Sequence, residues 1–265
     1  INAGLVGSEM CIRDRYSTGG SSGGSSALVA AGVIPIAHAN DGAGSIRIPA
    51  SCCGLVGLKA SRGRIKDKEV PGYLPANILH DGVVTRSVRD TWAFHAEIEK
   101  NIPAAEFPPI GDISESFPKN LKIAVLTENC LGENSSAELV QATHDVARLC
   151  ESLGHEVEMI SNPFYKKFDE DFWLLWAHFG FLIRYSVGKE LSSKFDHTQL
   201  EQWPKYLISR HWRNIHKVPV AFWRLRRFVS QYETFMQNFD ILLTPTLGTT
   251  VPKLGFLSPE VSGQE

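Results

Sequence analysis

The feature that most constrains this chain is a pair of glycine-serine loops that lie close together in the sequence. Residues 17–49 read STGGSSGGSSALVAAGVIPIAHANDGAGSIRIP. The first loop spans residues 19–24 and the second spans residues 41–45. Glycine has no Cβ, so it allows positive φ angles and lets other groups approach the backbone closely. We expect one helix and one strand between the loops to bring two serines, Ser21 and Ser45, into one place.

The second loop has the composition of an anion-binding turn. Successive backbone N–H groups at Gly42, Ala43, Gly44 and Ser45 can converge on one point. Beside a nucleophile, such a turn forms an oxyanion hole that stabilises the tetrahedral intermediate of acyl transfer. A serine hydroxyl is a weak nucleophile and needs a base within hydrogen-bond reach. Ser45 is therefore the candidate nucleophile, and Ser21 is a candidate relay to the base.

These residues resemble a known signature. GGSSGG followed by DGAGSIRIPASCCGLVGLK is similar to the signature of the amidase signature family, and FDILLTPTLG is similar to that family's C-terminal strand and loop. The resemblance covers most of residues 17–255. It implies an α/β fold of the α/β/α layered kind, with a central mixed sheet covered by helices. It also implies amide hydrolysis without a metal or an organic cofactor, most like bacterial amidases of the 6-aminohexanoate cyclic dimer hydrolase type.

The family uses a Ser–cis-Ser–Lys triad, whose serines match this sequence. By this resemblance Ser45 is the acylated nucleophile and Ser21 is the bridging serine in a cis peptide. The oxyanion turn corresponds to residues 42–45, where Ala43 stands at a position that is often glycine in the family.

The lysine of the triad is missing from the matching region. The family carries it on a strand several dozen residues before GGSSGG, whereas no lysine precedes Lys59 in this sequence. Lys59 itself matches a structural position of the signature. We expect residues 16–265 to be a partial amidase signature domain, truncated at the N-terminus and at the C-terminus and inactive as given. Residues 1–15 are interpreted as a non-native or disordered lead-in.

Three further residues are expected to support the serines. Asp41 and Arg47 flank the second turn, and a bidentate ion pair between them would hold it in shape. Ser22 lies beside Ser21 in the first loop. The segment 46–53 is predicted to be a helix that begins next to Ser45.

Parts of the sequence also allow functions other than amide hydrolysis by Ser45. Residues 20–24 match G-x-S-x-G, which would make Ser22 the nucleophile of an α/β-hydrolase, but that motif needs a strand directly before it and residues 13–18 are polar. His38 could serve Ser45 as a base, although a structural role is the simpler interpretation. A glycine-rich phosphate site is disfavoured because GxxxxGK[ST] does not occur. A non-catalytic, amidase-like scaffold without the lysine stays open.

Composition limits the partners. The 265 residues are 43% hydrophobic and 21% charged with a net charge of −2, enough for one large domain or two small ones. The balance gives no overall basic footprint for nucleic acid, and no run approaches the roughly 20 apolar residues of a membrane span. Five cysteines without metal-ligand spacing indicate a reducing cytoplasm. A small-molecule amide is the expected partner, no metal or membrane is expected, and a homodimer is allowed.

Hydrophobic periodicity and turn residues predict the remaining elements. The unit at residues 121–160 reads as strand, helix, strand and predicts a crossover within one sheet. Helices are expected at residues 25–32, 46–53, 87–99, 136–153 and 218–238, with further helices in the aromatic-rich segment 164–213. Strands are expected at residues 33–37, 55–58, 121–126, 155–160 and 241–244.

Overall fold

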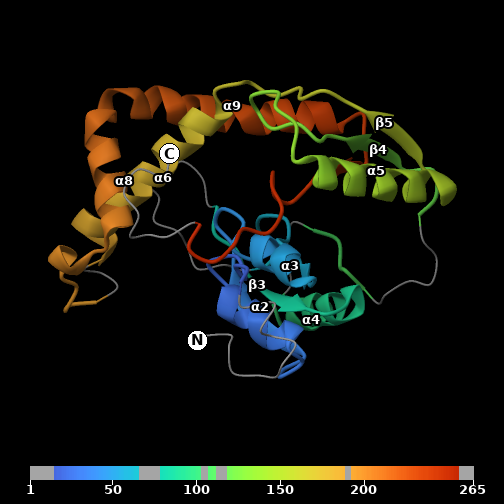
Figure 1. Cartoon of the computed structure of the whole chain (residues 1–265), viewed down its shortest axis with the longest axis horizontal. Helices are drawn as coiled ribbons and strands as arrows, with labels where there is room; N and C mark the ends of the chain where they lie inside the picture. Colours follow the sequence, from blue (N-terminus) through green and yellow to red (C-terminus); the bar gives the residue numbers. More distant parts are fainter. Residues whose placement is uncertain (1–14, 66–77, 103–106, 112–117, 189–191, 257–265) are drawn as a thin grey trace. The chain divides into compact units, whose positions relative to one another are not determined.

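The computed structural model describes residues 15–65, 78–102, 107–111, 118–188 and 192–256. The chain divides into two compact units (Figure 1). Unit 1 is Ile1–Pro118 with Thr249–Leu254, and unit 2 is Lys119–Gly248 with Gly255–Glu265. The expected lead-in falls almost wholly outside the described residues.

Unit 1 is built on a three-stranded antiparallel sheet in the order β1-β3-β2. The central strand β3 (Asp81–Thr85) pairs with β1 (Ile36–Asn40) on one side and with β2 (Val56–Gly57) on the other. Its described residues include the helices α2 (Gly23–Ala30), α3 (Arg47–Cys53) and α4 (Val88–Asn101).

The core of unit 1 holds the second glycine turn in place. The buried cluster consists of Val29, Ala39, Ile46, Ala50 and Val84. Ile46 directly follows Ser45 and its side chain is fully buried. Burying such a side chain stabilises a fold by about 1.5–3 kcal/mol. Packing of Ile46 in the core therefore holds the turn in place next to Ser45, the candidate nucleophile.

Unit 2 contains a parallel sheet in the order β5-β4-β6. The central strand β4 (Lys122–Val125) pairs in parallel with β5 (Glu156–Met159) and with β6 (Ile241–Leu243). Helix α5 (Ala137–Ser152) connects β4 to β5, which confirms the predicted crossover. Ile123, Val125 and Ala147 form the buried centre of this layer.

Most of the other elements described in unit 2 are helices. Helix α6 (Phe168–Leu182) packs against α8 (Gln202–Arg213) and α9 (Val218–Met236). The fully buried carboxylate of Asp171 on α6 accepts two hydrogen bonds from the Arg224 guanidinium on α9, at 2.6 and 2.5 Å. The described residues of this unit also include the short helical turns η2 (Ile183–Val187), η3 (His197–Gln199) and η4 (Ile215–Lys217).

The predicted α/β class is confirmed, with two differences in detail. The described strands lie in two sheets, one antiparallel and one parallel. The strand predicted as buried at residues 33–37 is found at Ile36–Asn40, and only Ala39 in it is buried. This strand is at the edge of an antiparallel sheet, where one face can be exposed to solvent, so its apolar run does not mark a core strand.

Candidate active site

The two glycine-serine loops lie against each other in unit 1. The backbone N–H of Ser22 donates to the carbonyl of Ser45 at 3.3 Å. The peptide between Gly20 and Ser21 is cis, as the resemblance implied. Gly19 has a φ of +73°, and a Cβ there would lie 3.0 Å from Cα of Pro49 in α3. The first loop is thus seated directly on the segment that follows Ser45.

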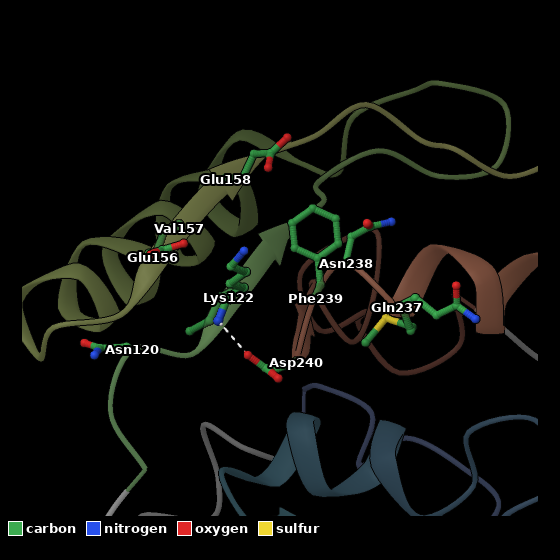
Figure 2. A pocket seen from close by; sticks show the side chains of 11 residues that line it. Asn120, Lys122, Glu156, Val157, Glu158, Gln237, Asn238, Phe239 and Asp240 are labelled. Atoms are coloured by element: carbon green, nitrogen blue, oxygen red, sulfur yellow. Dashed lines mark hydrogen bonds between the residues drawn. The ribbon is translucent and has the colours of Figure 1, made fainter.

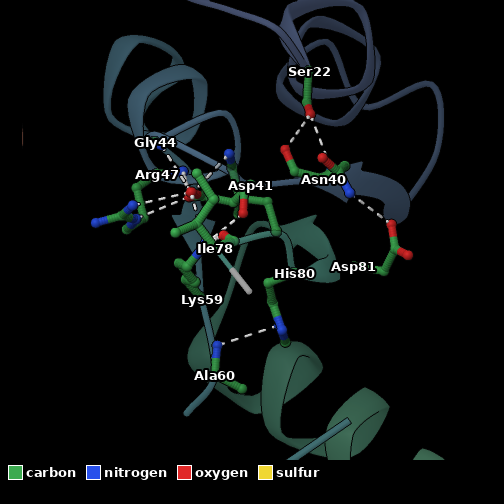
Figure 3. Close-up of polar contacts among 11 residues, drawn as sticks. Ser22, Asn40, Asp41, Gly44, Arg47, Lys59, Ala60, Ile78, His80 and Asp81 are labelled. Atoms are coloured by element: carbon green, nitrogen blue, oxygen red, sulfur yellow. Dashed lines mark hydrogen bonds and ion pairs between the residues drawn. The ribbon is translucent and has the colours of Figure 1, made fainter. Parts of the chain in front are cut away.

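Ser22 is held by the main chain of Asn40. Its hydroxyl donates to the Asn40 carbonyl at 3.3 Å and accepts the Asn40 N–H at 3.2 Å (Figure 3). Residues 17–22 form no strand, and α2 begins at Gly23. The strand that a nucleophile elbow requires is therefore missing from these described residues, and Ser22 fastens the first loop to β1. The α/β-hydrolase hypothesis loses its support.

Asp41 is the centre of the second turn. Its fully buried carboxylate accepts backbone N–H groups from Gly44 at 2.7 Å, Ile46 at 3.3 Å and Arg47 at 3.4 Å. The Arg47 guanidinium adds two hydrogen bonds of 2.9 Å, so the expected ion pair is present. Charge-assisted, bidentate bonds of this kind fix geometry as well as adding energy.

Lys59 completes the cluster around Asp41. Its ammonium donates to the carbonyls of Asp41 and Ile78, each at 2.5 Å, and lies 3.4 Å from the Asp41 carboxylate (Figure 3). Burial alone would raise the pKa of Asp41. Hydrogen bonds from Arg47 and Gly44, with the charges of Arg47 and Lys59, outweigh burial and hold that pKa well below its usual range. Lys59 therefore braces the turn, which agrees with the structural position assigned to it.

The backbone also ties Asp41 to the segment before β3. Asp41 N–H donates to the His80 carbonyl at 2.8 Å, and His80 N–H donates to the Asp41 carbonyl at 3.0 Å. The His80 ring is buried and its Nε2 accepts the Ala60 N–H at 3.3 Å. The Asp41–His80 pair extends the β1–β3 pairing by one residue, so the turn is fixed by its own hydrogen bonds and by the neighbouring strand.

The expected oxyanion turn needs one correction. The Gly44 N–H points at the Asp41 carboxylate, so it holds the turn and is not available to a ligand. Among the described residues, the N–H groups of Gly42, Ala43 and Ser45 donate to no protein acceptor. Three of the four expected donors therefore stay available. Gly44 itself has a φ of +112°, a conformation that favours glycine.

The two candidate catalytic hydroxyls are both accessible. Ser45 is half-buried and Ser21 is exposed. Within the described part of the chain, neither hydroxyl is hydrogen-bonded to another protein atom, including the other serine. The two loops are therefore joined through the backbone hydrogen bond from Ser22 to Ser45. The hydroxyls of Ser21 and Ser45 do not form the hydrogen bond that a proton relay between them requires.

His38 does not serve Ser45 in this arrangement. Its side chain is 74% exposed, and Nε2 lies 3.2 Å from Oδ1 of Asp81. Asn40 Nδ2 donates to the same oxygen at 2.9 Å (Figure 3). This supports the structural interpretation of His38.

The sequence does not predict the contacts of two residues at the site. Asn40 is a polar residue next to Asp41, and no sequence pattern indicates its role. The sequence predicts a structural position for Lys59 but not the groups that it contacts. The signal that could have found it is a lone cation that directly follows the apolar run at residues 55–58.

A separate hollow of about 770 Å³ lies in unit 2 (Figure 2). It is lined by charged groups of the parallel sheet and by the segment before β6, including Lys122, Glu156, Glu158 and Asp240. The Lys122 N–H donates to Asp240 at 2.8 Å. Its lining contains no serine, so it offers none of the chemistry of the two loops.

The part of the chain that the structure describes has no cluster of three or more potential metal ligands. None of its helices combines the length and apolar character needed to cross a bilayer.

The chain is similar to amidases along most of its length. The Amidase family profile matches residues 11–265. The putative amidase AmiC of Mycobacterium tuberculosis (strain ATCC 25618 / H37Rv) is 44% identical over 92% of this chain and 52% of that protein. The 6-aminohexanoate-cyclic-dimer hydrolase of Pseudomonas sp. (strain NK87) is 43% identical over 53% of this chain and 30% of that protein.

Solved structures agree with the sequence comparisons. A 6-aminohexanoate cyclic dimer hydrolase complexed with substrate superimposes with a TM-score of 0.74 at 27% identity, covering 94% of this chain and 55% of that chain. A bacterial aryl acylamidase of the amidase signature family gives a TM-score of 0.72 at 25% identity, covering 90% and 51%. The chain spans about half the length of these relatives. On the match along residues 11–265 and the likeness to AmiC, the chain belongs to the Amidase family.

Proposed function

We propose that this chain carries the serine half of an amidase site that cleaves a carboxylic amide C–N bond through an acyl-enzyme on Ser45. The observation that carries the proposal is the hydrogen bond between Ser22 and Ser45, which sets the first loop beside a half-buried serine with a free hydroxyl. Family membership supports amide hydrolysis in general. The identity of the nucleophile is our own step beyond it.

The proposed reaction uses both serines. Ser45 Oγ attacks the amide carbonyl carbon, and its proton passes by way of Ser21 to a base. The N–H groups of Gly42, Ala43 and Ser45 stabilise the negative oxygen of the tetrahedral intermediate. The C–N bond then breaks, the proton returns through Ser21 to the leaving amine, and water hydrolyses the resulting ester of Ser45.

The base of this reaction is the lysine that the resemblance places before GGSSGG. Lys59 cannot replace it, because its ammonium is bound to two carbonyls and the Asp41 carboxylate. We therefore expect the chain as given to turn over very slowly. A small-molecule amide is the proposed substrate and no cofactor is invoked. The proposed location, a reducing cytoplasm, rests on cysteine usage, and a homodimer is allowed.

Covalent labelling tests the nucleophile without needing turnover. The purified chain is treated with a fluorophosphonate at alkaline pH, which lowers the demand for a base, and the adduct is located by peptide mass spectrometry. We expect the adduct on Ser45, its loss in Ser45→Ala, and its retention in Ser51→Ala, a matched control at an exposed serine of α3. An adduct on Ser22 would refute the assignment.

A non-catalytic scaffold is the second candidate. It is favoured by one observation, that Lys59 is bound to two carbonyls and to the Asp41 carboxylate and so does not act as a base for Ser45. If the folded chain gives no adduct on Ser45 under conditions in which the same reagent labels a known serine hydrolase, the scaffold hypothesis replaces the enzyme hypothesis.

A further inference from the structure

The corner where α8 meets α9 has an unusual charge. Residues 202–232 contain seven Lys and Arg side chains and no Asp or Glu, whereas the whole chain has 27 basic and 29 acidic residues. This segment covers α8, the turn η4 and most of α9, which meet at a bend in unit 2 (Figure 1). Arg224 is paired with Asp171, and Arg210 donates to the Tyr206 hydroxyl at 3.1 Å.

The same corner exposes large apolar side chains. Trp212 at the end of α8 is 50% exposed, and Trp223 on α9 is 58% exposed. Ile215 and Val220 between them are each exposed by close to half. Indole rings are usually largely covered in folded proteins, so two half-exposed tryptophans within one bend are informative.

Cations and apolar groups alternate on this surface. On α9, Val220, Trp223 and Arg227 follow one another at spacings of three and four residues, which places them on one helix face. The Arg227 guanidinium lies over the Trp223 ring at 5.3 Å. The opposite face of α9 carries the buried residues Val218 and Ala221.

Three cations at the corner have no acidic partner among the described residues. Arg213 and Lys217 flank the turn η4, and Arg227 lies one turn beyond Trp223; all three are exposed. The acidic residues nearest in sequence, Glu201 and Glu233, lie outside the basic segment. The charge at this corner is therefore not neutralised from its own helices.

We propose that the α8–α9 corner, defined by Trp212, Arg213, Lys217, Trp223 and Arg227, is a docking surface for an anionic lipid bilayer. Tryptophan is enriched at the level of lipid headgroups, and surface helices that bind anionic lipids combine it with Lys and Arg. An acidic protein is the competing occupant, and the test below distinguishes it from the bilayer. This proposal departs from the expectation that no membrane is a partner, which was based on the lack of an apolar run long enough to span a bilayer; peripheral docking does not need such a run.

Vesicle binding tests the proposal independently of the amidase reaction. The whole chain is mixed with vesicles of phosphatidylcholine alone or of phosphatidylcholine and phosphatidylglycerol in equal amounts. Bound protein is measured by sedimentation and by the blue shift of tryptophan emission. We expect binding to the anionic vesicles at about 0.1 M salt, and its loss at about 1 M salt, where the Debye length falls from about 10 to about 3 Å.

Charge-reversal variants locate the surface. The triple variant Arg213→Glu, Lys217→Glu and Arg227→Glu should bind anionic vesicles at least about a hundred-fold more weakly, because each cation near an anionic leaflet contributes about a five-fold gain in binding. A matched triple variant at three other exposed cations has the same net charge and should bind like the wild type: Arg62→Glu, Arg89→Glu and Lys119→Glu. Trp223→Ala should weaken binding while leaving its salt dependence unchanged.

Three outcomes would overturn the proposal. These are no binding to anionic vesicles, equal binding to phosphatidylcholine alone, and equal losses in the two triple variants. Saturable binding to polyglutamate without vesicle binding would assign the corner to an acidic protein instead. Far-ultraviolet circular dichroism checks that each variant is folded, and the double variant Arg213→Lys and Arg227→Lys should keep its binding in case the reversals unfold α9.

Discussion

Asp41 determines the shape of the candidate site at the scale of single residues. Its carboxylate gathers three backbone N–H groups, the Arg47 guanidinium and the Lys59 ammonium. No part of this side chain is exposed. A buried carboxylate that loses its compensating partners is costly, and here the partners belong to the turn that carries Ser45. The residue that shapes the turn is thus four places away from Ser45, the proposed nucleophile.

Replacing Asp41 should therefore loosen the turn. Asp41→Asn removes the negative charge and leaves the Arg47 and Lys59 cations facing a neutral amide. Breaking a buried pair in this way costs about 3–5 kcal/mol in the free energy of unfolding. Asp145→Asn is the control, because Asp145 is an exposed partner of Arg148 on α5 and such pairs contribute at most about 1 kcal/mol. Urea unfolding measures both, and equal losses would contradict the role assigned to Asp41.

At the scale of elements, two histidines lie in the packed interface of the unit 2 helices. His178 on α6 and His211 on α8 have ring centroids 5.1 Å apart, and Phe222 on α9 lies 5.1 Å from His178. The Nδ1 atoms of both rings are buried without a hydrogen-bond partner among the described residues. Burial lowers the pKa of both rings, and the charge of His211 lowers that of His178 further. The interface therefore requires neutral imidazoles.

This requirement predicts how stability depends on pH. Above about pH 6.5 both rings are neutral in the folded and unfolded states and contribute no slope. As pH falls below that value, the unfolded chain takes up protons that the folded chain does not, so the free energy of unfolding decreases until the lowered folded pKa is reached. The urea midpoint should fall over this interval. His211→Phe should reduce the slope, whereas the exposed control His216→Phe should not.

Two other buried histidines remain in His211→Phe and keep part of the slope. One is His178, and the other is His95 in α4, whose pKa is also lowered by burial and whose Nε2 has no hydrogen-bond partner among the described residues. A residual slope is therefore expected in His211→Phe. An unchanged slope in that variant would contradict the neutral interface.

At the scale of the whole molecule, the chain consists of two units that each have a sheet and a buried core of their own. The two serine loops and the Asp41 cluster belong to unit 1, and the aromatic helices and the basic corner belong to unit 2. A chain of this kind can open one region without the other, because local unfolding follows contiguous cooperative units.

The units should respond separately to a change in the site. In Asp41→Asn, amide hydrogen exchange should accelerate in peptides covering β1, α3 and β3. Peptides covering β4, β5 and β6 should exchange as in the wild type. Mass spectrometry of peptides resolves the two sets. Arg224→Leu leaves the buried Asp171 carboxylate without its cation in unit 2, with only the Tyr165 hydroxyl bond at 3.2 Å, and it is the reciprocal variant, which should accelerate exchange in α6 and α9 alone. Acceleration of both sets by either change would show that the units unfold together.

Local sequence patterns predicted most of the helices and strands, and at the site they predicted the two loops and the Asp41–Arg47 ion pair. The helices around residues 25–32, 46–53 and 136–153 and the parallel strands at 121–126 and 155–160 were predicted close to their observed bounds. Their periodicity and end signals are local properties. The strand before Asp41 was misplaced, because an apolar run does not tell whether a strand lies at the edge of a sheet.

The sequence by itself determined the family, the α/β class and the two loops. The glycines, the serines and the Asp41–Arg47 pair lie within a few residues of one another, so their spacing is enough to predict the local backbone conformation. Only the tertiary structure decided that the Gly44 N–H serves Asp41, that Ser22 is bound to Asn40, and that Lys59 braces the turn. Each of these depends on the direction of a donor or on a contact between segments distant in the sequence, and a linear pattern of residue types contains neither.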